Sequence, residues 1–246
     1  MDSTFPTRAI ILNRRDWREA DRLVSVYTPD HGRLTLAARG ARKLGSKLAP
    51  HLEPISISRL LVVKGRGFDL VGAALVEESF LNIKQDLNRL YFAGQALRFF
   101  MRLLEDGEPD PELFAWLEKW LLNLEAAAGE ENLPKEDGRF RLALFAWRLF
   151  ALLGYQPELQ KCVVCGGALA PGKNNFDLAQ GGLVCGDCAV AKVGEAKNGA
   201  LLPLSDNCIK LLRLVEGGTW KNVKFSPQLL KEWENLNTAL ANWLRS

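Results

Sequence analysis

The chain has 246 residues, of which 48% are apolar and 25% charged, an ordinary globular composition sufficient for one large domain or two modest ones. The formal net charge of +3 is too small to indicate a partner, but the charge is unevenly distributed. Residues 1–70 hold 13 Lys and Arg against 7 Asp and Glu, whereas the remaining residues hold 19 against 22, an asymmetry typical of a polyanion-binding module on a slightly acidic body.

The chain shows no targeting or membrane-spanning signal. Its start, "MDSTFPTRAIILNRRDW", contains Asp2 and only a short apolar run, unlike a signal peptide. The most apolar later stretch, "LALFAWRLFALLGY", is interrupted by Arg148 and is too short for a membrane span. We therefore expect a cytoplasmic protein whose cysteines do not form structural disulfides.

The first eighty residues have the pattern of β structure. Short apolar or β-branched runs are separated by the polar and Gly/Pro-rich segments "RDWRE", "PDHG" and "GRG". Five strands are expected, at residues 8–15, 20–28, 32–40, 55–64 and 68–78. Five strands in so short a segment indicate a small barrel, either an OB-fold, which binds oligonucleotides, or an SH3-like barrel.

Helical periodicity begins after Ser79. In the first helix, Leu87, Leu90, Gly94, Leu97, Met101 and Leu104 are spaced to form one buried apolar stripe. A second helix is expected over "PDPELFAWLEKWLLNLEAAA", beginning at Asp110-Pro111, and a third over "GRFRLALFAWRLFALLG", ending at Gly154. Two more are expected over 204–216 and over 226–244, the latter beginning at Ser226-Pro227. We interpret the aromatic residues Trp116, Trp120, Phe145 and Trp147 as helix-bundle core.

Four of the five cysteines form two closely spaced pairs. Cys162 and Cys165 stand in "KCVVCGG", and Cys185 and Cys188 in "VCGDCA", giving a C-x2-C…C-x2-C pattern that indicates a tetrahedral zinc site. Gly166 and Gly186 permit tight turns around the sulfurs, and the segment between the pairs has hairpin punctuation like that of a zinc ribbon. A redox dithiol or buried thiols are the alternatives. A complete four-thiolate shell leaves no coordination position for catalysis. Cys208 has no close cysteine partner and is expected to be a buried free thiol.

A basic segment follows the third expected strand. Residues 37–51, "AARGARKLGSKLAPH", contain four cations and no acid. Such a loop can lie along a phosphate backbone with little sequence preference, although many charge runs are only solvated surface. Arg14, Arg15 and Arg18 form a second cluster in the turn after the first strand. Trp17 in that turn is the best base-stacking candidate, with a partial core role as its alternative, whereas Tyr27 and Phe68 are expected in the core.

No catalytic constellation is evident. The two histidines, His31 and His51, lack a metal-ligand or triad arrangement, and no phosphate-binding loop or dinucleotide fingerprint occurs. We expect no enzymatic activity and no small-molecule substrate. A zinc-dependent nuclease is disfavoured because the four-cysteine shell is closed.

The string "RRDWREADRLVSVYTPDHGRLTLAARGARKLGSKLAPHLEPISISRLLV" closely resembles the N-terminal domain of the bacterial RecO family of recombination mediators. The later "LLGYQPELQKCVVCGGALAPGKNNFDLAQGGLVCGDC" is similar to that family's cysteine signature. Trp17-Arg18 departs from the family pattern, in which glycine is common. The resemblance covers nearly the whole chain.

The resemblance implies an α+β multidomain protein with an N-terminal five-stranded OB-fold barrel, an α-helical domain and an inserted four-cysteine zinc ribbon. The implied domains are 1–80 (OB-fold), 81–157 and 201–246 (helical), and 158–200 (zinc). The implied function is binding single- and double-stranded DNA, annealing strands, and helping, with RecR, to load RecA onto DNA coated by single-strand-binding protein, whose acidic C-terminal tail is contacted. The implied cofactor is structural Zn2+, held by Cys162, Cys165, Cys185 and Cys188.

For DNA contacts we expect Arg39, Arg42, Lys43 and Lys47 first, and then Arg14, Arg15, Arg18 and Arg66. Arg139, Arg141 and Arg148 are candidates for the rim of a groove that takes the acidic tail, with helix-surface solubility as their alternative role. The competing reading of the whole chain is a protein–protein adaptor of a repair complex with only weak DNA binding.

Overall fold

The computed structural model describes residues 4–126, 132–192, 201–218 and 225–245. The chain divides into two compact units, Met1–Gly138 and Arg139–Ser246, and each is described by itself. The predicted division into 1–80, 81–157, 158–200 and 201–246 is a finer one and stays a prediction.

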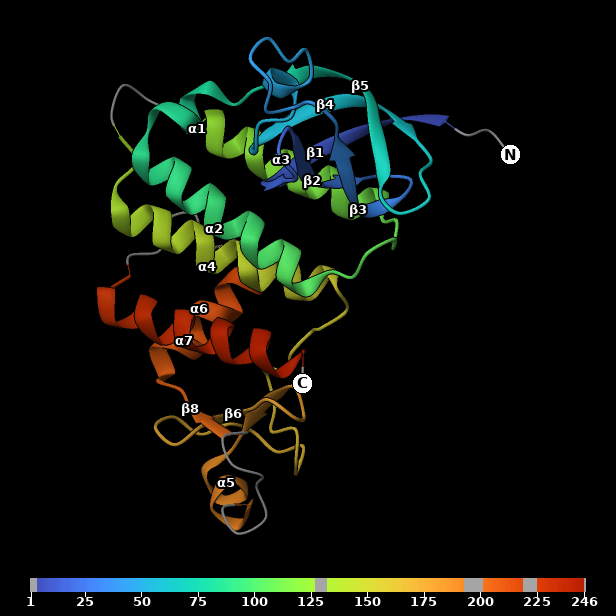
Figure 1. The fold of residues 1–246 in the computed structure, drawn as a ribbon. Coiled ribbons are helices and arrows are strands. Elements are labelled where there is room, and N and C mark those ends of the chain that lie inside the picture. Colours follow the sequence, from blue (N-terminus) through green and yellow to red (C-terminus); the bar gives the residue numbers. More distant parts are fainter. Residues whose placement is uncertain (1–3, 127–131, 193–200, 219–224, 246) are drawn as a thin grey trace. The chain divides into compact units, whose positions relative to one another are not determined.

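The first unit contains a closed barrel of five strands (Figure 1). The strands are β1 (Thr4–Trp17), β2 (Asp21–Thr28), β3 (Gly32–Ala38), β4 (Ser56–Val63) and β5 (Asp69–Glu78), with the short 3-10 helix η1 (Ala49–His51) before β4. Their order around the barrel is β1-β2-β3-β5-β4, and β1 closes it by pairing antiparallel with both β2 and β4. This five-stranded barrel confirms the predicted OB-fold and removes the SH3-like alternative.

The length of β1 explains how the barrel closes. The sequence predicts a strand over 8–15, whereas β1 begins at Thr4 and ends at Trp17. Its first half pairs with β4, from Thr4–Val63 onward, and its second half pairs with β2. A register shift between Ile11 and Asn13 marks the change, as a β-bulge re-aims a strand. Apolar side chains from all five strands fill the barrel, among them Ile11, Val26, Leu36, Val62 and Val71.

Three helices complete the first unit: α1 (Leu81–Gln85), α2 (Leu87–Leu103) and α3 (Pro111–Ala126). Helix α2 contacts β1, and α3 contacts β2. Tyr27 of β2 is 1% exposed and packs edge-on against Phe100 at 5.0 Å between ring centroids and stacks near Phe114 at 6.4 Å. Tyr27 is therefore core, as predicted. The Asp110 side chain accepts the N–H of Leu113 and caps α3 as expected.

The predicted apolar stripe of α2 is wrong in its first half. Leu87 and Leu90 are 83% and 37% exposed, and the buried face consists instead of Arg89, Phe92, Ala93, Ala96, Leu97 and Phe100. The helix is rotated because the buried carboxylate of Asp86 accepts hydrogen bonds from the Arg89 N–H and guanidinium and from the Leu133 N–H. The buried Asp86–Arg89 ion pair thus occupies the core position that the helical spacing predicted for leucines.

The second unit is built on three helices: α4 (Lys135–Leu152, which begins in the first unit), α6 (Asp206–Glu216) and α7 (Pro227–Trp243). Gly154, at φ +86°, follows α4 in the left-handed conformation typical of a helix end, and Ser226 caps α7 by accepting the Leu229 N–H. Both predicted boundary signals are confirmed. Phe145 and Trp147 are buried as predicted, whereas Trp116 and Trp120 of α3 are only half-buried.

The cysteine-bearing segment adds small elements to the second unit. A three-stranded sheet has the order β7 (Gly182–Val184), β6 (Asn175–Asp177), β8 (Leu201–Pro203), and the short helix α5 (Gly186–Lys192) follows β7 (Figure 1). Strands β6 and β7 form the hairpin that the sequence predicts between the two cysteine pairs.

Candidate metal centre and nucleic-acid interface

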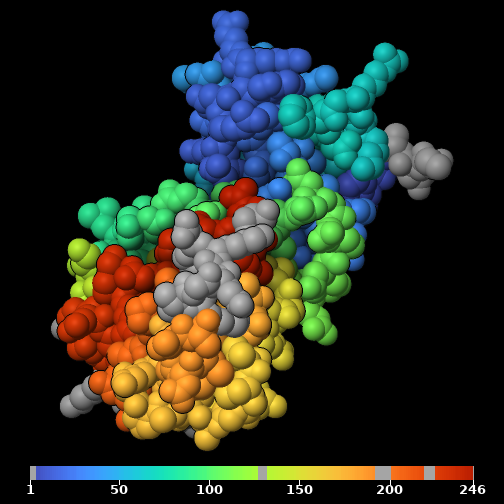
Figure 2. Space-filling view, turned by 90° about the horizontal axis from the view of Figure 1, so that it is seen from below, coloured from blue at the N-terminus to red at the C-terminus, as the bar shows by residue number. Residues whose placement is uncertain are grey.

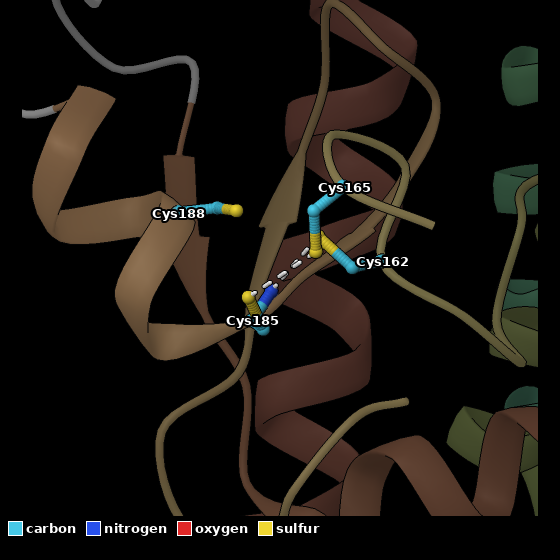
Figure 3. A group of neighbouring side chains, drawn as sticks. All are labelled: Cys162, Cys165, Cys185 and Cys188. Atoms are coloured by element: carbon cyan, nitrogen blue, oxygen red, sulfur yellow. Dashed lines mark hydrogen bonds between the residues drawn. The ribbon is translucent and has the colours of Figure 1, made fainter. Parts of the chain in front are cut away.

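The two cysteine pairs converge although about twenty residues separate them. The four sulfurs of Cys162, Cys165, Cys185 and Cys188 all lie within 4.8 Å of one another. Figure 3 shows Cys188 pointing from α5 toward the other three, and Cys185 standing just before that helix. The Cys165 and Cys185 sulfurs are 4.0 Å apart. Four thiolates bound to zinc at about 2.3 Å in a tetrahedron lie about 3.8 Å from one another, so the cluster fits a four-cysteine zinc site.

Backbone geometry prepares the first pair for a metal. The Gly166 N–H donates to the Cys162 carbonyl at 2.9 Å, and Gly166 adopts φ +71°, which closes the turn between Cys162 and Cys165. Gly186 has a different role. A Cβ added there would lie 2.8 Å from the Cβ of Lys173, so the close packing against Lys173 requires glycine.

Hydrogen bonding lowers the pKa of the Cys162 thiol. Burial by itself raises the pKa of Cys162, but the backbone N–H groups of Cys165, Cys185 and Val164 outweigh it and lower that pKa to about 6. The Cys185 N–H lies 3.4 Å from the Cys162 sulfur. The pKa of Cys188 is raised, first by hydrogen bonds with the Cys185 and Cys165 side chains. The hydrogen bonds to the Cys162 sulfur therefore favour its thiolate form, which is the form that metal binding needs.

The remaining cysteine is separate from this cluster. Cys208 of α6 is fully buried, and burial raises the pKa of its thiol to about 12. It is the buried free thiol that the sequence predicts. Among the residues that the structure describes, the four clustered cysteines are the one group of three or more His, Cys, Asp or Glu side chains close enough to share a metal.

In the first unit, side-chain contacts join three connecting loops of the barrel. The Arg42 guanidinium donates to the carbonyls of Arg18 and Glu19, at 3.2 and 3.0 Å, which fixes the segment after β3 to the β1–β2 turn. The rings of Trp17 and Phe68 are 5.5 Å apart, which joins the β1–β2 turn to the β4–β5 turn. We call residues 17–20, 39–47 and 64–68 the loop cluster. In the space-filling view of Figure 2, the blue N-terminal part of this unit lies beside its teal part.

The four first-choice cations, Arg39, Arg42, Lys43 and Lys47, are all exposed in the loop cluster. Within the described part of the chain, Arg39, Lys43 and Lys47 have no acidic partner within ion-pairing distance. Arg42 differs, because it also lies 3.4 Å from the Asp16 carboxylate and its own N–H donates to Ala20. Arg42 thus positions the loops, whereas the other three cations are available to an anion.

The second-choice cations are distributed over two surfaces. Arg15, Arg18 and Arg66 are exposed, and Arg18 and Arg66 belong to the loop cluster. Arg14 is half-buried and forms an ion pair with Glu53. Adjacent residues of a strand point to opposite faces, so Arg14 and Arg15 do not serve one surface. All eight cations stay predictions of DNA contacts, with Arg14 and Arg42 already engaged inside the protein.

One feature of this region contradicts the sequence prediction. Phe68 is 39% exposed, whereas it was expected in the core. The sequence prediction placed Phe68 at the start of the strand over 68–78, but Phe68 precedes β5 and belongs to the turn. The flanking "KGRG", a turn signal, is the feature of the sequence that could have indicated exposure.

The candidate rim cations of α4 are engaged in the second unit. The Arg139 guanidinium forms an ion pair with Glu234 of α7 at 2.8 Å, and Arg148 donates to the Val215 carbonyl of α6 at 2.9 Å. A cavity of about 420 Å³ beside Arg148 is lined also by Glu158 and Glu216. The two acids disfavour an acidic ligand in the cavity beside Arg148, and the contacts of Arg139 and Arg148 join α4 to α7 and α6.

Neither histidine takes part in a catalytic arrangement. The Nδ1 of His51 accepts the Val76 N–H at 3.3 Å, and His31 packs on the Phe5 ring at 4.1 Å.

In the described ranges, no helix combines the length and the hydropathy needed to span a membrane.

Comparison with known proteins identifies the family. The model of "Recombination protein O N terminal" matches residues 1–80, and that of "Recombination protein O C terminal" matches residues 84–243. The chain is 32% identical over 238 residues to "DNA repair protein RecO" of Desulforamulus reducens, covering 97% of this chain and 86% of that protein.

Two further relatives agree. The protein of the same name from Roseiflexus sp. is 34% identical over 240 residues, covering 96% of this chain and 79% of the relative. That of Myxococcus xanthus is 39% identical over 185 residues, covering 74% of this chain and 71% of the relative. With an OB-fold barrel, a helical region and a four-cysteine cluster in this order, the chain belongs to the RecO family of DNA repair proteins.

Proposed function

We propose that the chain binds single- and double-stranded DNA through the loop cluster and anneals complementary strands without covalent chemistry. The observation that carries this proposal is the exposure of Arg39, Lys43 and Lys47 in an acid-free loop, with no acidic partner among the described residues. Cations not neutralised by the protein release the counterions of a phosphate backbone when they bind it. Holding two strands on one basic surface reduces their mutual repulsion, and base pairing then drives annealing.

Zinc, when bound by Cys162, Cys165, Cys185 and Cys188, supplies cross-linking of the chain, not a reactive position. All four ligands come from the protein, and a tetrahedral ion then has no site for water or substrate. The residues around it are small and close-packed, since Cys162 is 1% exposed and packs with Val184 and Ala189. The four-cysteine cluster therefore supports a structural role and a non-enzymatic protein.

We extend the proposal to the family's wider role by its membership alone: the chain helps, together with RecR, to load recombinase onto DNA covered by single-strand-binding protein, whose acidic tail it contacts. Arg141 is the remaining rim candidate on α4, half-buried and with no ion pair among the described residues. Its replacement by glutamate is expected to weaken binding of an acidic tail peptide while leaving DNA affinity unchanged.

The test is fluorescence anisotropy of labelled single-stranded DNA, titrated with the protein at several salt concentrations, followed by an annealing assay on complementary strands. A slope of log affinity against log salt of about −2 or steeper is expected if three or more phosphates are contacted. Weak binding with a shallow slope and no annealing contradicts the proposal. The protein–protein adaptor function then becomes the better account.

A further inference from the structure

Two aromatic side chains meet at the tips of two barrel hairpins. Trp17 is the last residue of β1, and Phe68 immediately precedes β5. Fifty-one positions separate them in the sequence, yet their ring centroids are 5.5 Å apart, with an interplanar angle of 82°. Phe68 is 39% exposed and Trp17 is half-buried. The two rings, brought together at adjacent loop tips with one of them exposed, present an aromatic surface on which a planar group can stack.

A planar group already lies on the Trp17 ring. The guanidinium carbon of Arg18 is 4.1 Å from the ring centroid. Arg18 is exposed, and the described residues place no acid within ion-pairing distance of it. Its backbone adopts φ +54°, a left-handed conformation that brings the side chain back over its neighbour. The face of the Trp17 ring is thus covered by the planar, exposed guanidinium of Arg18, which another planar group can displace.

Both hairpin tips are held in position by the protein. In the β4–β5 turn, the Asp69 carboxylate accepts the Gly65 N–H at 3.0 Å and the Lys64 ammonium at 2.9 Å. A Cβ at Gly65 lies 2.1 Å from the Phe68 carbonyl oxygen, so the turn closes only with glycine there. Arg42 holds the β1–β2 turn through the Arg18 and Glu19 carbonyls. The aromatic pair is therefore positioned before any ligand arrives.

We propose that Trp17 and Phe68 form a stacking site for unpaired nucleobases, which gives the loop cluster a preference for single-stranded over double-stranded DNA. This inference rests on the proposed DNA binding. Phosphate contacts alone do not distinguish a strand with exposed bases from one without. Bases in a duplex are stacked on their neighbours, whereas an unpaired base can stack on an exposed ring. The base takes the place of the Arg18 guanidinium, which then reaches the adjacent phosphate.

A purely structural role for the pair makes a different prediction. If the ring contact only joins the two hairpins, its loss lowers the stability of the barrel and weakens binding of all nucleic acids equally. Stacking instead contributes only where a base is present and unpaired. An abasic strand, which keeps the phosphates and lacks the bases, separates the two roles.

The experiment measures the affinities of the full-length protein for a single-stranded oligonucleotide, for an abasic strand of the same length, and for the duplex. The wild-type protein is expected to bind the base-containing strand about 10-fold more tightly than the abasic strand. Trp17→Leu/Phe68→Leu, which keeps apolar contacts between the hairpins, is expected to bring this ratio close to one. Affinity for the abasic strand and the duplex, and the salt slope, stay unchanged.

Two variants complete the test. Tyr91→Leu removes an aromatic side chain of α2 that is 56% exposed, and it is expected to leave the ratio unchanged. If the double variant does not fold, the single variant Phe68→Leu, which removes the more exposed ring, is measured in its place. A wild-type ratio near one, or a ratio unchanged by the Leu variants in a protein that still binds DNA, overturns the stacking site alone. Failure of the wild-type protein to bind any of the three ligands overturns the proposed function.

Discussion

The four-cysteine cluster and the loop cluster both come from short sequence motifs, but they differ in how far the motif determines the positions of its side chains. Each cysteine pair is local, and the β6–β7 hairpin needs only to bring one pair to the other. The cations of the loop cluster have no such internal constraint. Arg42 donates to the Arg18 and Glu19 carbonyls of the neighbouring turn, while Arg39, Lys43 and Lys47 stay exposed with no acidic partner among the described residues. A motif whose members bind one another predicts its own geometry, whereas a run of like charges does not.

Removal of a cysteine ligand tests the first region and gives the largest expected effect. Cys185→Ser is expected to abolish tight zinc binding and to destabilise the second unit by several kcal/mol, since a structural zinc ion contributes folding free energy directly. Zinc content by mass spectrometry and thermal unfolding with and without a chelator measure this. The control variant Cys208→Ala changes a cysteine outside the cluster, and it is expected to bind zinc as the wild-type protein does. Retention of zinc by the Ser variant contradicts the four-cysteine site.

Substitution at the buried ion pair at the start of α2 measures how much this pair stabilises the first unit. Asp86 and Arg89 are 3% and 4% exposed. Asp86→Asn is expected to lower the free energy of unfolding by about 3 kcal/mol, because it leaves the buried guanidinium without its counter-charge. Asp106→Asn, at an exposed carboxylate that pairs with Arg33, is expected to cost less than about 1 kcal/mol. Urea denaturation measures both.

The pH dependence of the Asp86 effect has a definite sign. Burial tends to raise the pKa of Asp86, but the N–H groups of Arg89 and Leu133 and the Arg89 charge hold it below its usual value. A carboxyl with a depressed folded-state pKa stabilises the protein above its unfolded pKa of about 3.9, and this contribution is lost as the pH falls through the folded value. The difference between wild type and Asp86→Asn is therefore expected to shrink at acid pH. An undiminished difference at pH 3 and below argues against the ion pair.

Neutralising the exposed cations tests the second region directly. The triple variant Arg39→Gln/Lys43→Gln/Lys47→Gln is expected to weaken single-stranded DNA binding about 10-fold or more and to reduce the salt slope by about 2, since each phosphate contact contributes about 0.7. The matched control is Lys119→Gln/Lys210→Gln/Lys231→Gln, which removes three exposed cations elsewhere and changes net charge equally. Equal losses in both variants show that overall charge, and not the loop cluster, determines affinity.

The smallest effect is expected at Arg42. Arg42→Lys keeps the charge, but one ammonium group cannot replace both the Nη1 hydrogen bonds to the Arg18 and Glu19 carbonyls and the Nε contact with the Asp16 carboxylate. Affinity for single-stranded DNA is expected to fall about 3-fold, which corresponds to the modest energy of a single exposed hydrogen-bonding group. Arg39→Lys, at a position with no partner among the described residues, is expected to leave anisotropy titrations unchanged. Identical behaviour of the two variants shows that Arg42 acts only as a charge.

Much of the architecture was predictable from residue patterns. The alternating runs of the first eighty residues indicated five strands, and the cap residues Asp110, Ser226 and Gly154 marked helix ends that the structure confirms. These signals succeed because they act within a few residues. The register of α2 failed for the opposite reason, since Asp86 recruits the Leu133 N–H from 47 positions away and rotates the helix toward it.

The sequence by itself determined the family, the strand-rich start, the helical remainder and the four cysteines, because spacing along the chain is enough to specify each of them. Only the tertiary structure decided that the barrel closes as an OB-fold, that Arg42 holds a turn, and that Trp17 meets Phe68 at an accessible surface. These features depend on contacts between residues far apart in the chain. Such contacts follow from how the strands close and pack, which no local pattern of residues encodes.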